Sequence, residues 1–373
     1  MRCLFLAPLK APDHPVPSGE RTMARLFMRL LASLGYEVVL ASTLRSFCAE
    51  PGPAHWDGMR AAADEEVARL LAELRAGPAV ACVFTYHVYY KAPDLIGPAL
   101  ARALGVPYVI AEPSRAPKRA TGPFAQGHAL AEAAIDAATL LLTPTAADRE
   151  MLELHRPAPQ RIVDLKPFLD LAQWPCVPVQ RTMTDASTTR LVTVAMMRHG
   201  DKLASYRQLG QALAGLAGDW TLDVVGDGAA RPDVEAALAP LGVRVRYRGA
   251  LTSHAALGAA LAAADLFVWP GVNEAFGAVY LEAQAHGLPC VAGAYGGIAD
   301  AVREGETALL TPPGDTGALR AAIAALMAAP ARRQAMAQAA ARFIATERTL
   351  PIAAAHVADA FDRAGIARPA RAA

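Results

Sequence analysis

Short apolar runs alternate with longer, alanine-rich segments of helical periodicity along almost the whole chain of 373 residues. The runs are apolar throughout rather than alternating with polar residues, which is typical of strands covered on both faces. Such strands form parallel sheets whose neighbours are joined by crossover helices. The sequence therefore predicts a doubly wound α/β architecture. The expected strands are 2–7, 37–41, 79–85, 108–111, 139–143, 191–195, 221–225, 243–247, 266–269, 289–292 and 308–311.

These runs outnumber the strands that one such sheet usually holds, so two domains are expected. The best boundary is a proline-containing polar stretch without apolar periodicity. We therefore expect a Rossmann-like N-terminal domain over 1–172, a linker over 173–189 and a second α/β domain over 190–345. A helical segment over 346–373 is expected to pack back toward the N-terminal domain. Ligands of open α/β sheets bind at the carboxyl ends of the strands, so the cleft between two such domains is the expected site.

Composition excludes several classes of protein. Lys and Arg number 36 against 35 Asp and Glu, and this balance argues against a dedicated nucleic-acid binder. A hydrophobic content of 54% argues against disorder. We find no run of about 18 apolar, uncharged residues that would predict a membrane span. The five cysteines are odd in number and form no CxxC pair, which indicates a reducing cytoplasm and no metal site.

Two consecutive strand ends carry residues suited to a polyhydroxylated ligand. Glu274 lies in the loop after the strand 266–269, and Glu282 lies in the helix that follows. Carboxylates accept charge-assisted hydrogen bonds from sugar hydroxyls, and the amides of 276–278 lie at the positive end of the helix dipole. The next strand leads to Gly296-Gly297, which permits close approach of a ligand to the backbone. Taken singly, the acids could also be ordinary helix residues and the glycines a tight turn.

The segment from Glu274 to Asp315 resembles the retaining glycosyltransferases of family 4, also called group 1. The family's E-x7-E signature matches Glu274 to Glu282, followed in the family's order by Gly287-Leu288-Pro289, Gly296-Gly297-Ile298 and Gly305 to Asp315. The resemblance implies the GT-B fold, in which two Rossmann-like doubly wound domains face each other across a cleft. It also implies a hexosyltransferase (EC 2.4) that uses a UDP- or GDP-sugar with retention of configuration, without a metal ion or other cofactor.

The same resemblance implies roles for the matching residues of the second domain. Glu282 would hold the ribose of the nucleotide, and Glu274 would contact hydroxyls of the donor sugar. The amides near Phe276 and Gly277 would help to orient that sugar, and the Gly296-Gly297 loop would approach the donor as well.

Arg198 and Lys202 match the family's diphosphate-binding cations. Fixed cations would stabilise the charge that a leaving diphosphate gains as the glycosidic bond breaks. The spacing departs from the family, which places Arg and Lys five residues apart and follows Lys with Gly. Here the spacing is four and Leu203 follows, which puts the role of Lys202 in question. Without the neighbouring motifs, both residues would be read as part of a solvated loop.

The first domain offers three further candidates. Ser18-Gly19 opens the first predicted helix and could place amides near the donor, or it could simply be an N-cap. His87, just past the strand 79–85, matches a position where the family has a histidine near the sugar, although a structural role is the alternative. Glu112, at the end of the strand 108–111, is a further cleft-facing candidate.

Two basic features bear on the acceptor. Arg21, Arg25 and Arg29 recur every four residues and form one helical stripe, and three basic residues cluster in the loop 115–119. They form either a solvated face or a surface for an anionic acceptor or a phospholipid. The expected partners are a nucleotide sugar and an acceptor glycan, lipid or small molecule, in cell-surface glycan or glycolipid synthesis, with peripheral contact to the inner face of the membrane. The sequence does not determine the oligomeric state.

Four rival functions can be compared with the sequence. A GT-B sugar-nucleotide epimerase or a phosphorylase would use the same donor residues. A catalytically silent sugar-binding protein is disfavoured by the intact pair Glu274 and Glu282. A Rossmann dehydrogenase is poorly supported, since Gly226-Asp227-Gly228 lacks the third glycine of the dinucleotide fingerprint.

Overall fold

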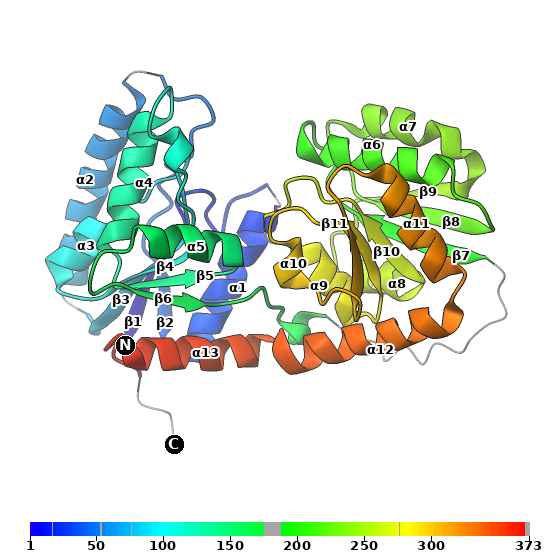
Figure 1. The fold of residues 1–373 in the computed structure, drawn as a ribbon. Helices are drawn as coiled ribbons and strands as arrows, with labels where there is room; N and C mark the ends of the chain where they lie inside the picture. Colours follow the sequence, from blue (N-terminus) through cyan, green and yellow to red (C-terminus); the bar gives the residue numbers. More distant parts are fainter. Residues whose placement is uncertain (17, 53, 76, 175–187, 276, 370–373) are drawn as a thin grey trace. The chain divides into compact units, whose positions relative to one another are not determined.

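The computed structural model describes residues 1–16, 18–52, 54–75, 77–174, 188–275 and 277–369 (Figure 1). The chain forms two compact units, one of Met1–Lys166 with Pro351–Ala373 and one of Pro167–Leu350. Each unit contains a six-stranded sheet whose strand pairs are all parallel. The predicted α/β architecture with two doubly wound sheets is confirmed.

The sheet of the first unit has the order β2-β1-β3-β4-β5-β6. Strands β4 and β5 are buried along their whole length, which explains their continuous apolar sequence. Helices α2, α3 and α4 pack side by side. The strands are β1 (Arg2–Leu6), β2 (Glu37–Leu40), β3 (Val80–Val88), β4 (Tyr108–Pro113), β5 (Leu140–Thr143) and β6 (Arg161–Asp164). The helices are α1 (Gly19–Ser33), α2 (His55–Leu74), α3 (Gly97–Leu104), η1 (Pro117–Arg119), α4 (Ala125–Ala137), α5 (Ala146–Leu154) and α13 (Leu350–Arg363).

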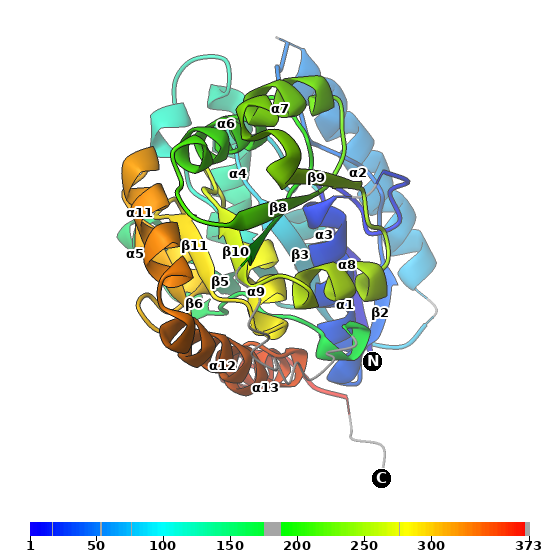
Figure 2. The same ribbon diagram turned by 90° about the vertical axis from the view of Figure 1, so that its right-hand side faces the viewer.

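The sheet of the second unit has the order β12-β11-β10-β7-β8-β9. Helix α6 packs against α7 and α11, and α9 packs against α12 (Figures 1 and 2). The strands are β7 (Thr189–Val194), β8 (Trp220–Val225), β9 (Val245–Gly249), β10 (Leu266–Trp269), β11 (Cys290–Gly293) and β12 (Ala308–Thr311). The helices are η2 (Leu171–Gln173), α6 (Asp201–Ala214), α7 (Arg231–Leu238), η3 (Ala239–Arg244), α8 (His254–Ala262), α9 (Ala278–Ala285), α10 (Ile298–Ala301), α11 (Thr316–Met327) and α12 (Pro330–Glu347).

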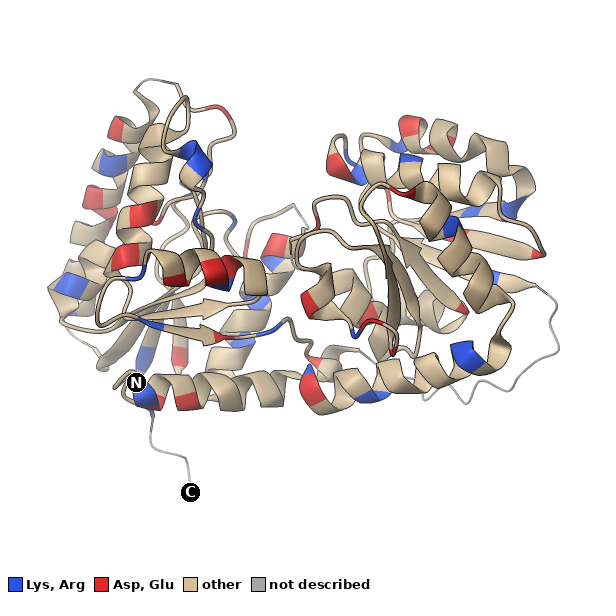
Figure 3. Ribbon diagram, in the orientation of Figure 1, with Lys and Arg blue, Asp and Glu red and all other residues tan. Residues whose placement is uncertain are grey.

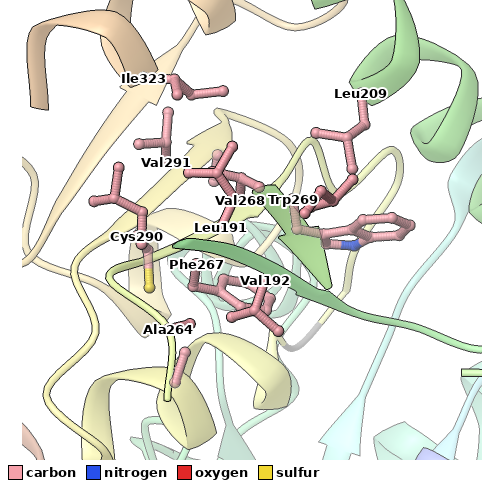
Figure 4. Close-up of a cluster of buried hydrophobic side chains, with 14 of the residues drawn as sticks. Leu191, Val192, Leu209, Ala264, Phe267, Val268, Trp269, Cys290, Val291 and Ile323 are labelled. Atoms are coloured by element: carbon pink, nitrogen blue, oxygen red, sulfur yellow. The ribbon is translucent and has the colours of Figure 1, made fainter. Parts of the chain in front are cut away.

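The core of the second unit lies between its sheet and the covering helices. Figure 4 shows Leu191 and Phe267 from neighbouring strands together with Leu209 of α6 and Ile323 of α11. All four side chains are at most 1% exposed. The strands β7 and β10 therefore lie at the centre of a buried core. This core fixes the positions from which the loops after β7 and β10 begin.

The division between the units differs from the predicted boundary at residue 172. The chain enters the second unit at Pro167, because Leu169 pairs with Thr349 and packs with Leu281 and Phe343 of that unit. The predicted linker 173–189 lies mostly outside the described residues, which omit 175–187. From Pro351 onward the chain belongs to the first unit, where Phe361 of α13 contacts the ring of Tyr36.

Gly226 and Gly228, which follow β8, are explained by packing rather than by dinucleotide binding. Their φ angles are 146° and 150°, a region that residues with a side chain rarely adopt. A Cβ atom on Gly226 would lie 1.9 Å from the carbonyl oxygen of Ala195, and one on Gly228 would lie 2.4 Å from that of Met197. The two glycines thus let the loops after β7 and β8 touch.

Candidate functional site

The loop after β10 brings Glu274 to Lys202. Glu274 Oε2 lies 2.5 Å from Lys202 Nζ, and their side chains are 19% and 28% exposed. Lys202 occupies the first turn of α6, and its ammonium group also lies 5.9 Å from the centre of the Trp269 ring. Two residues that the sequence analysis predicted separately thus form one half-buried ion pair, despite the short spacing between Arg198 and Lys202.

Two hydrogen bonds between residues that sequence reasoning missed hold this loop against α6. Asn273 has a φ of 51°, and its side-chain amide donates to Asp201 Oδ1 at 2.9 Å. The backbone N–H of Val272 donates to Ser205 Oγ at 2.9 Å. Left-handed conformations in residues other than glycine are strained and concentrate at functional sites. The asparagine directly before Glu274 could have indicated a left-handed backbone at this position, since asparagine tolerates this conformation better than most residues.

The predicted glycine pair lies against the same loop. Gly297 N–H donates to the carbonyl oxygen of Glu274 at 3.1 Å. Gly296 has a φ of 48°, and a Cβ atom there would lie 2.3 Å from that same carbonyl oxygen. The two strand-end loops after β10 and β11 are therefore in direct contact, as a shared ligand site requires. Gly277 caps α9 with a φ of 71°, and Phe276 lies outside the described residues.

Glu282 lies on α9 with a half-buried side chain. In the described part of the chain, no group donates a hydrogen bond to its carboxylate, and it forms no ion pair with the other predicted site residues. Burial raises the pKa of Glu282 to about 8. A buried carboxylate without a hydrogen-bond donor is costly to ionise. A ligand whose hydroxyls donate to this carboxylate would lower that cost.

Replacing Glu282 by glutamine is expected to stabilise the protein in a pH-dependent way. The pKa of this carboxyl is higher in the folded state than in the unfolded state, so ionisation above the unfolded value destabilises the fold. The gain in the free energy of unfolding should be nearly absent at about pH 3.5, below the unfolded pKa, and should grow with rising pH to about 3–5 kcal/mol by about pH 9. Urea unfolding of both proteins at the two pH values measures it. An equal gain at both would show that the carboxylate is not the cause.

Arg198 lies apart from the ion pair. Its side chain is exposed and forms no hydrogen bond or ion pair with a described residue. Its backbone carbonyl accepts from Leu203 N–H at 3.0 Å, which joins the loop after β7 to the start of α6. The structure therefore places Arg198 near the first turn of α6 without fixing its guanidinium.

The first unit contains a second charged cluster, formed at the ends of neighbouring strands. His87 Nδ1 lies 2.9 Å from Glu20 Oε2 and 3.7 Å from Glu112 Oε1. The Tyr86 hydroxyl donates to Glu20 Oε2 at 3.2 Å. His87 and Glu112 both have left-handed φ angles, 60° and 58°, although neither is glycine. Strained backbone at the ends of both β3 and β4 again coincides with candidate functional side chains.

The charges of this cluster are interdependent. Burial by itself would lower the pKa of His87, but the carboxylates of Glu20 and Glu112 outweigh it and raise that pKa to about 9. Burial opposes ionisation of Glu20, yet the charge of His87 lowers its pKa. Burial raises the pKa of Glu112 to about 7, although His87 acts in the opposite direction. At neutral pH, His87 is thus a cation beside an ionised Glu20.

Sequence reasoning missed Glu20, which shares the first turn of α1 with the predicted Gly19. Ser18 Oγ accepts from Arg21 N–H at 3.3 Å, so Ser18 is an N-cap. A Cβ atom on Gly19 would meet no atom within 4 Å, and no contact of Gly19 with the His87 cluster is seen among the described residues.

Most of the predicted basic features have structural partners. Arg21 donates to the carbonyl oxygens of His14 and Pro15, and Arg25 donates to that of Pro12. Arg115 is buried and pairs with Glu132 and Asp136. Arg115 is thus neutralised by two carboxylates, whereas Arg21 and Arg25 keep their positive charge, so an anionic-acceptor surface on the helical stripe stays a prediction. Figure 3 shows acidic and basic residues interspersed along both units.

The described residues also bear on a metal centre and on a membrane span. They contain no group of three or more His, Cys, Asp or Glu side chains arranged to hold a metal ion. Within the same part of the chain, no helix combines the length and the apolar character needed to cross a bilayer.

Part of the second unit is similar in sequence to a known protein family. Residues 188–329 match the family model described as "Glycosyl transferases group 1". The 2-deoxystreptamine glucosyltransferase of Streptomyces kanamyceticus is 29% identical over 259 residues, which cover 64% of this chain and 65% of the relative. The chain thus spans slightly less than two thirds of that relative's length. The family-model match over residues 188–329 contains Arg198, Lys202, Glu274, Glu282 and the Gly296-Gly297 pair.

Solved structures match the chain over nearly its whole length. Sucrose-phosphate synthase from Thermosynechococcus elongatus has a TM-score of 0.74 at 19% identity and covers 97% of this chain and 99% of its own. An Anabaena protein solved in complex with UDP has a TM-score of 0.72 at 16% identity, covering 97% and 100%. At these identities the similarity shows the fold alone. The chain has the two-unit α/β fold of GT-B glycosyltransferases, as the sequence predicted.

Proposed function

We propose that this protein is a glycosyltransferase of the group 1 kind, which moves a sugar from a nucleoside-diphosphate sugar to an acceptor hydroxyl. The observation that carries the proposal is the Lys202–Glu274 ion pair in contact with the Gly296-Gly297 loop. This places a cation, a carboxylate and an accessible stretch of backbone together at the carboxyl ends of β10 and β11. A sugar diphosphate needs these three groups, and all of them lie in the segment that matches the family.

In the proposed reaction, the diphosphate of the donor competes with Glu274 for the ammonium group of Lys202. Glu274 is then released to accept hydrogen bonds from the hydroxyls of the transferred sugar. Lys202 and the exposed Arg198 stabilise the negative charge that the leaving diphosphate gains. Glu282 accepts hydrogen bonds from the ribose. Its unpartnered carboxylate supports this role.

We propose retention of configuration through attack on the same face of the sugar. The acceptor oxygen bonds to the anomeric carbon as the bond to the diphosphate breaks, and the proton of the hydroxyl passes to a phosphate oxygen. In this scheme the Glu274 carboxylate accepts hydrogen bonds from the sugar hydroxyls, so we propose no covalent intermediate on it. With two cations available for the leaving group, we propose transfer without a metal ion. Activity should therefore survive EDTA.

The first unit is the proposed acceptor unit. His87 is a cation held by Glu20, and its ring can donate a hydrogen bond to a hydroxyl oxygen of sugar or acceptor. Two comparisons suggest where to start. One relative is described as a glucosyltransferase with the small cyclitol 2-deoxystreptamine, and one structural neighbour was solved with UDP. UDP-glucose is therefore the first donor to test.

A binding screen tests the donor assignment. The melting temperature is measured with UDP-, GDP- and ADP-glucose, and slow hydrolysis of each donor is followed by release of the nucleotide. We expect one donor to raise the melting temperature of the wild type. Glu282→Ala and Arg198→Ala should each lower the affinity for that donor by about tenfold or more. Glu304→Ala and Arg332→Ala change exposed residues outside the site and serve as controls. If no nucleotide sugar stabilises the wild type, the donor-site assignment fails. If the site variants behave like the controls, the residue roles fail.

A further inference from the structure

A turn at the end of β3 presents an aromatic ring and a lysine side by side. Tyr89 and Ala92 pair as an antiparallel bridge, with Ala92 N–H donating to the carbonyl oxygen of Tyr89 at 2.9 Å. Tyr90 and Lys91 therefore occupy the tip of a tight turn. Both side chains are half-buried. The tip extends the strand that carries His87, and the Tyr89 ring lies 4.9 Å from the His87 ring.

The connection from β4 to α4 supplies the other half of the cluster. The Phe124 ring lies 5.0 Å from the Tyr90 ring, edge to face. Arg119 Cζ lies 5.3 Å from the centre of the Tyr90 ring and 5.5 Å from that of Phe124. Lys91 Nζ lies 5.8 Å and 5.2 Å from the same two centres. Two cations thus share the same two rings, and we call these four residues the cation–aromatic cluster.

A glycine in α4 lets the tip of this turn pack closely against the helix. Gly127 lies in the first turn of α4, where glycine is an unfavourable helix residue. A Cβ atom there would lie 2.4 Å from the carbonyl oxygen of Tyr90 and 2.7 Å from the Trp56 ring. The missing side chain lets the turn tip pack directly on the helix.

The cluster has an excess of positive charge. Neither Lys91 nor Arg119 forms an ion pair with a carboxylate of the described residues. Arg119 Nε is buried and finds no hydrogen-bond acceptor. Arg115, four residues earlier in the same connection, pairs with both Glu132 and Asp136. Cation–π contacts partly stabilise the two buried charges but do not neutralise them, so a bound anion would offset this excess of positive charge.

We propose that the cation–aromatic cluster binds a phosphate group carried by the acceptor. A guanidinium and an ammonium group together match the charge and the several oxygens of a phosphate. The cluster adjoins His87, so the phosphate would lie beside the hydroxyl-binding part of the first unit. The proposal rests on the proposed function only in assigning this unit to the acceptor. The phosphate belongs either to a small phosphorylated molecule or to a lipid headgroup.

Direct binding measurements test the site without donor or turnover. Inorganic phosphate and glycerol 3-phosphate are titrated by calorimetry into wild type, Lys91→Met, Arg119→Met and the control Lys118→Met. Lys118 is an exposed neighbour outside the cluster, so its loss removes the same charge. We expect each cluster variant to weaken phosphate binding by about tenfold or more, and the control by less than about twofold. Co-sedimentation with phosphatidylcholine vesicles, with and without phosphatidylglycerol, distinguishes the sources. Cluster-dependent binding of glycerol 3-phosphate in solution indicates a small acceptor, and cluster-dependent binding to the anionic vesicles alone indicates a lipid.

A second readout uses only the wild-type protein. Bound phosphate should slow chemical acetylation of Lys91 and leave that of Lys118 unchanged. The proposal is overturned if neither phosphate nor anionic vesicles bind, if Lys118→Met loses as much affinity as the cluster variants, or if the ligand that binds fails to protect Lys91. Failure of the donor screen with intact phosphate binding would overturn the proposed function and leave this site standing.

Discussion

A Glu274→Gln variant is expected to transfer sugar about 100-fold more slowly than the wild type, or slower still. Glutamine keeps the size of the side chain but loses the charge that pairs with Lys202 and would accept hydrogen bonds from the sugar. The effect should appear in kcat, because these hydrogen bonds strengthen as the sugar gains positive charge on the way to the transition state. Steady-state kinetics with the donor found in the screen measures it.

Affinity for the nucleoside diphosphate provides an internal control for this variant. The free Lys202 no longer has Glu274 as a partner, so the diphosphate should bind at least as tightly as to the wild type. Lys202→Met should have the opposite effect and lower the affinity for the nucleoside diphosphate, because it removes the cation. Glu304→Gln, at an exposed position, should change neither quantity. Unchanged kcat in Glu274→Gln, with melting temperature preserved, would remove Glu274 from the mechanism.

A Gly226→Ala variant is expected to lose about 3 kcal/mol or more of unfolding free energy. The added methyl group would lie 1.9 Å from the carbonyl oxygen of Ala195, which is backbone at the end of a central strand. The φ of 146° is also unfavourable for alanine. Neither the clash nor the strain can be relieved without moving β7 or β8 in the buried core. Urea unfolding measures the loss.

Gly305→Ala separates the strain from the clash. Gly305 also has a positive φ, 79°, but a Cβ atom there would meet nothing within 4 Å. Its loss should be about 1 kcal/mol, the cost of the left-handed conformation alone. Equal losses in the two variants would mean that the contact between the loops after β7 and β8 contributes nothing.

Parts of the proposed donor site were predictable because they follow strand ends. Glu274, Lys202 and Gly296-Gly297 lie in the loop or the first helical turn after a buried apolar run, and parallel strands bring such positions to one edge of the sheet. Their pairing was not predictable, since Lys202 and Glu274 are 72 residues apart and the strands β7 and β10 are not consecutive. Asn273 was missed for a related reason. Its role depends on a left-handed backbone and on Asp201 from another element.

The edge strand β6 was also missed. Strand β6 has four residues of mixed exposure, so its sequence shows no continuous apolar run. Glu20 was overlooked because it looks like an ordinary acid in a first helical turn. Only its contact with His87, which lies 67 residues further along the chain, separates it from other such acids.

The sequence by itself determined the parallel α/β architecture, because strands covered on both faces must be apolar throughout and this pattern is local. It also determined which residues at the strand ends are chemically suited to a sugar nucleotide. The tertiary structure decided which of those residues meet and which charges remain unbalanced. It neutralised Arg115 with two acids while leaving Lys91 and Arg119 over two aromatic rings without a carboxylate among the described residues. Which of these charges meets a carboxylate depends on distances between segments that are far apart in the sequence. The order of residues along the chain does not give those distances.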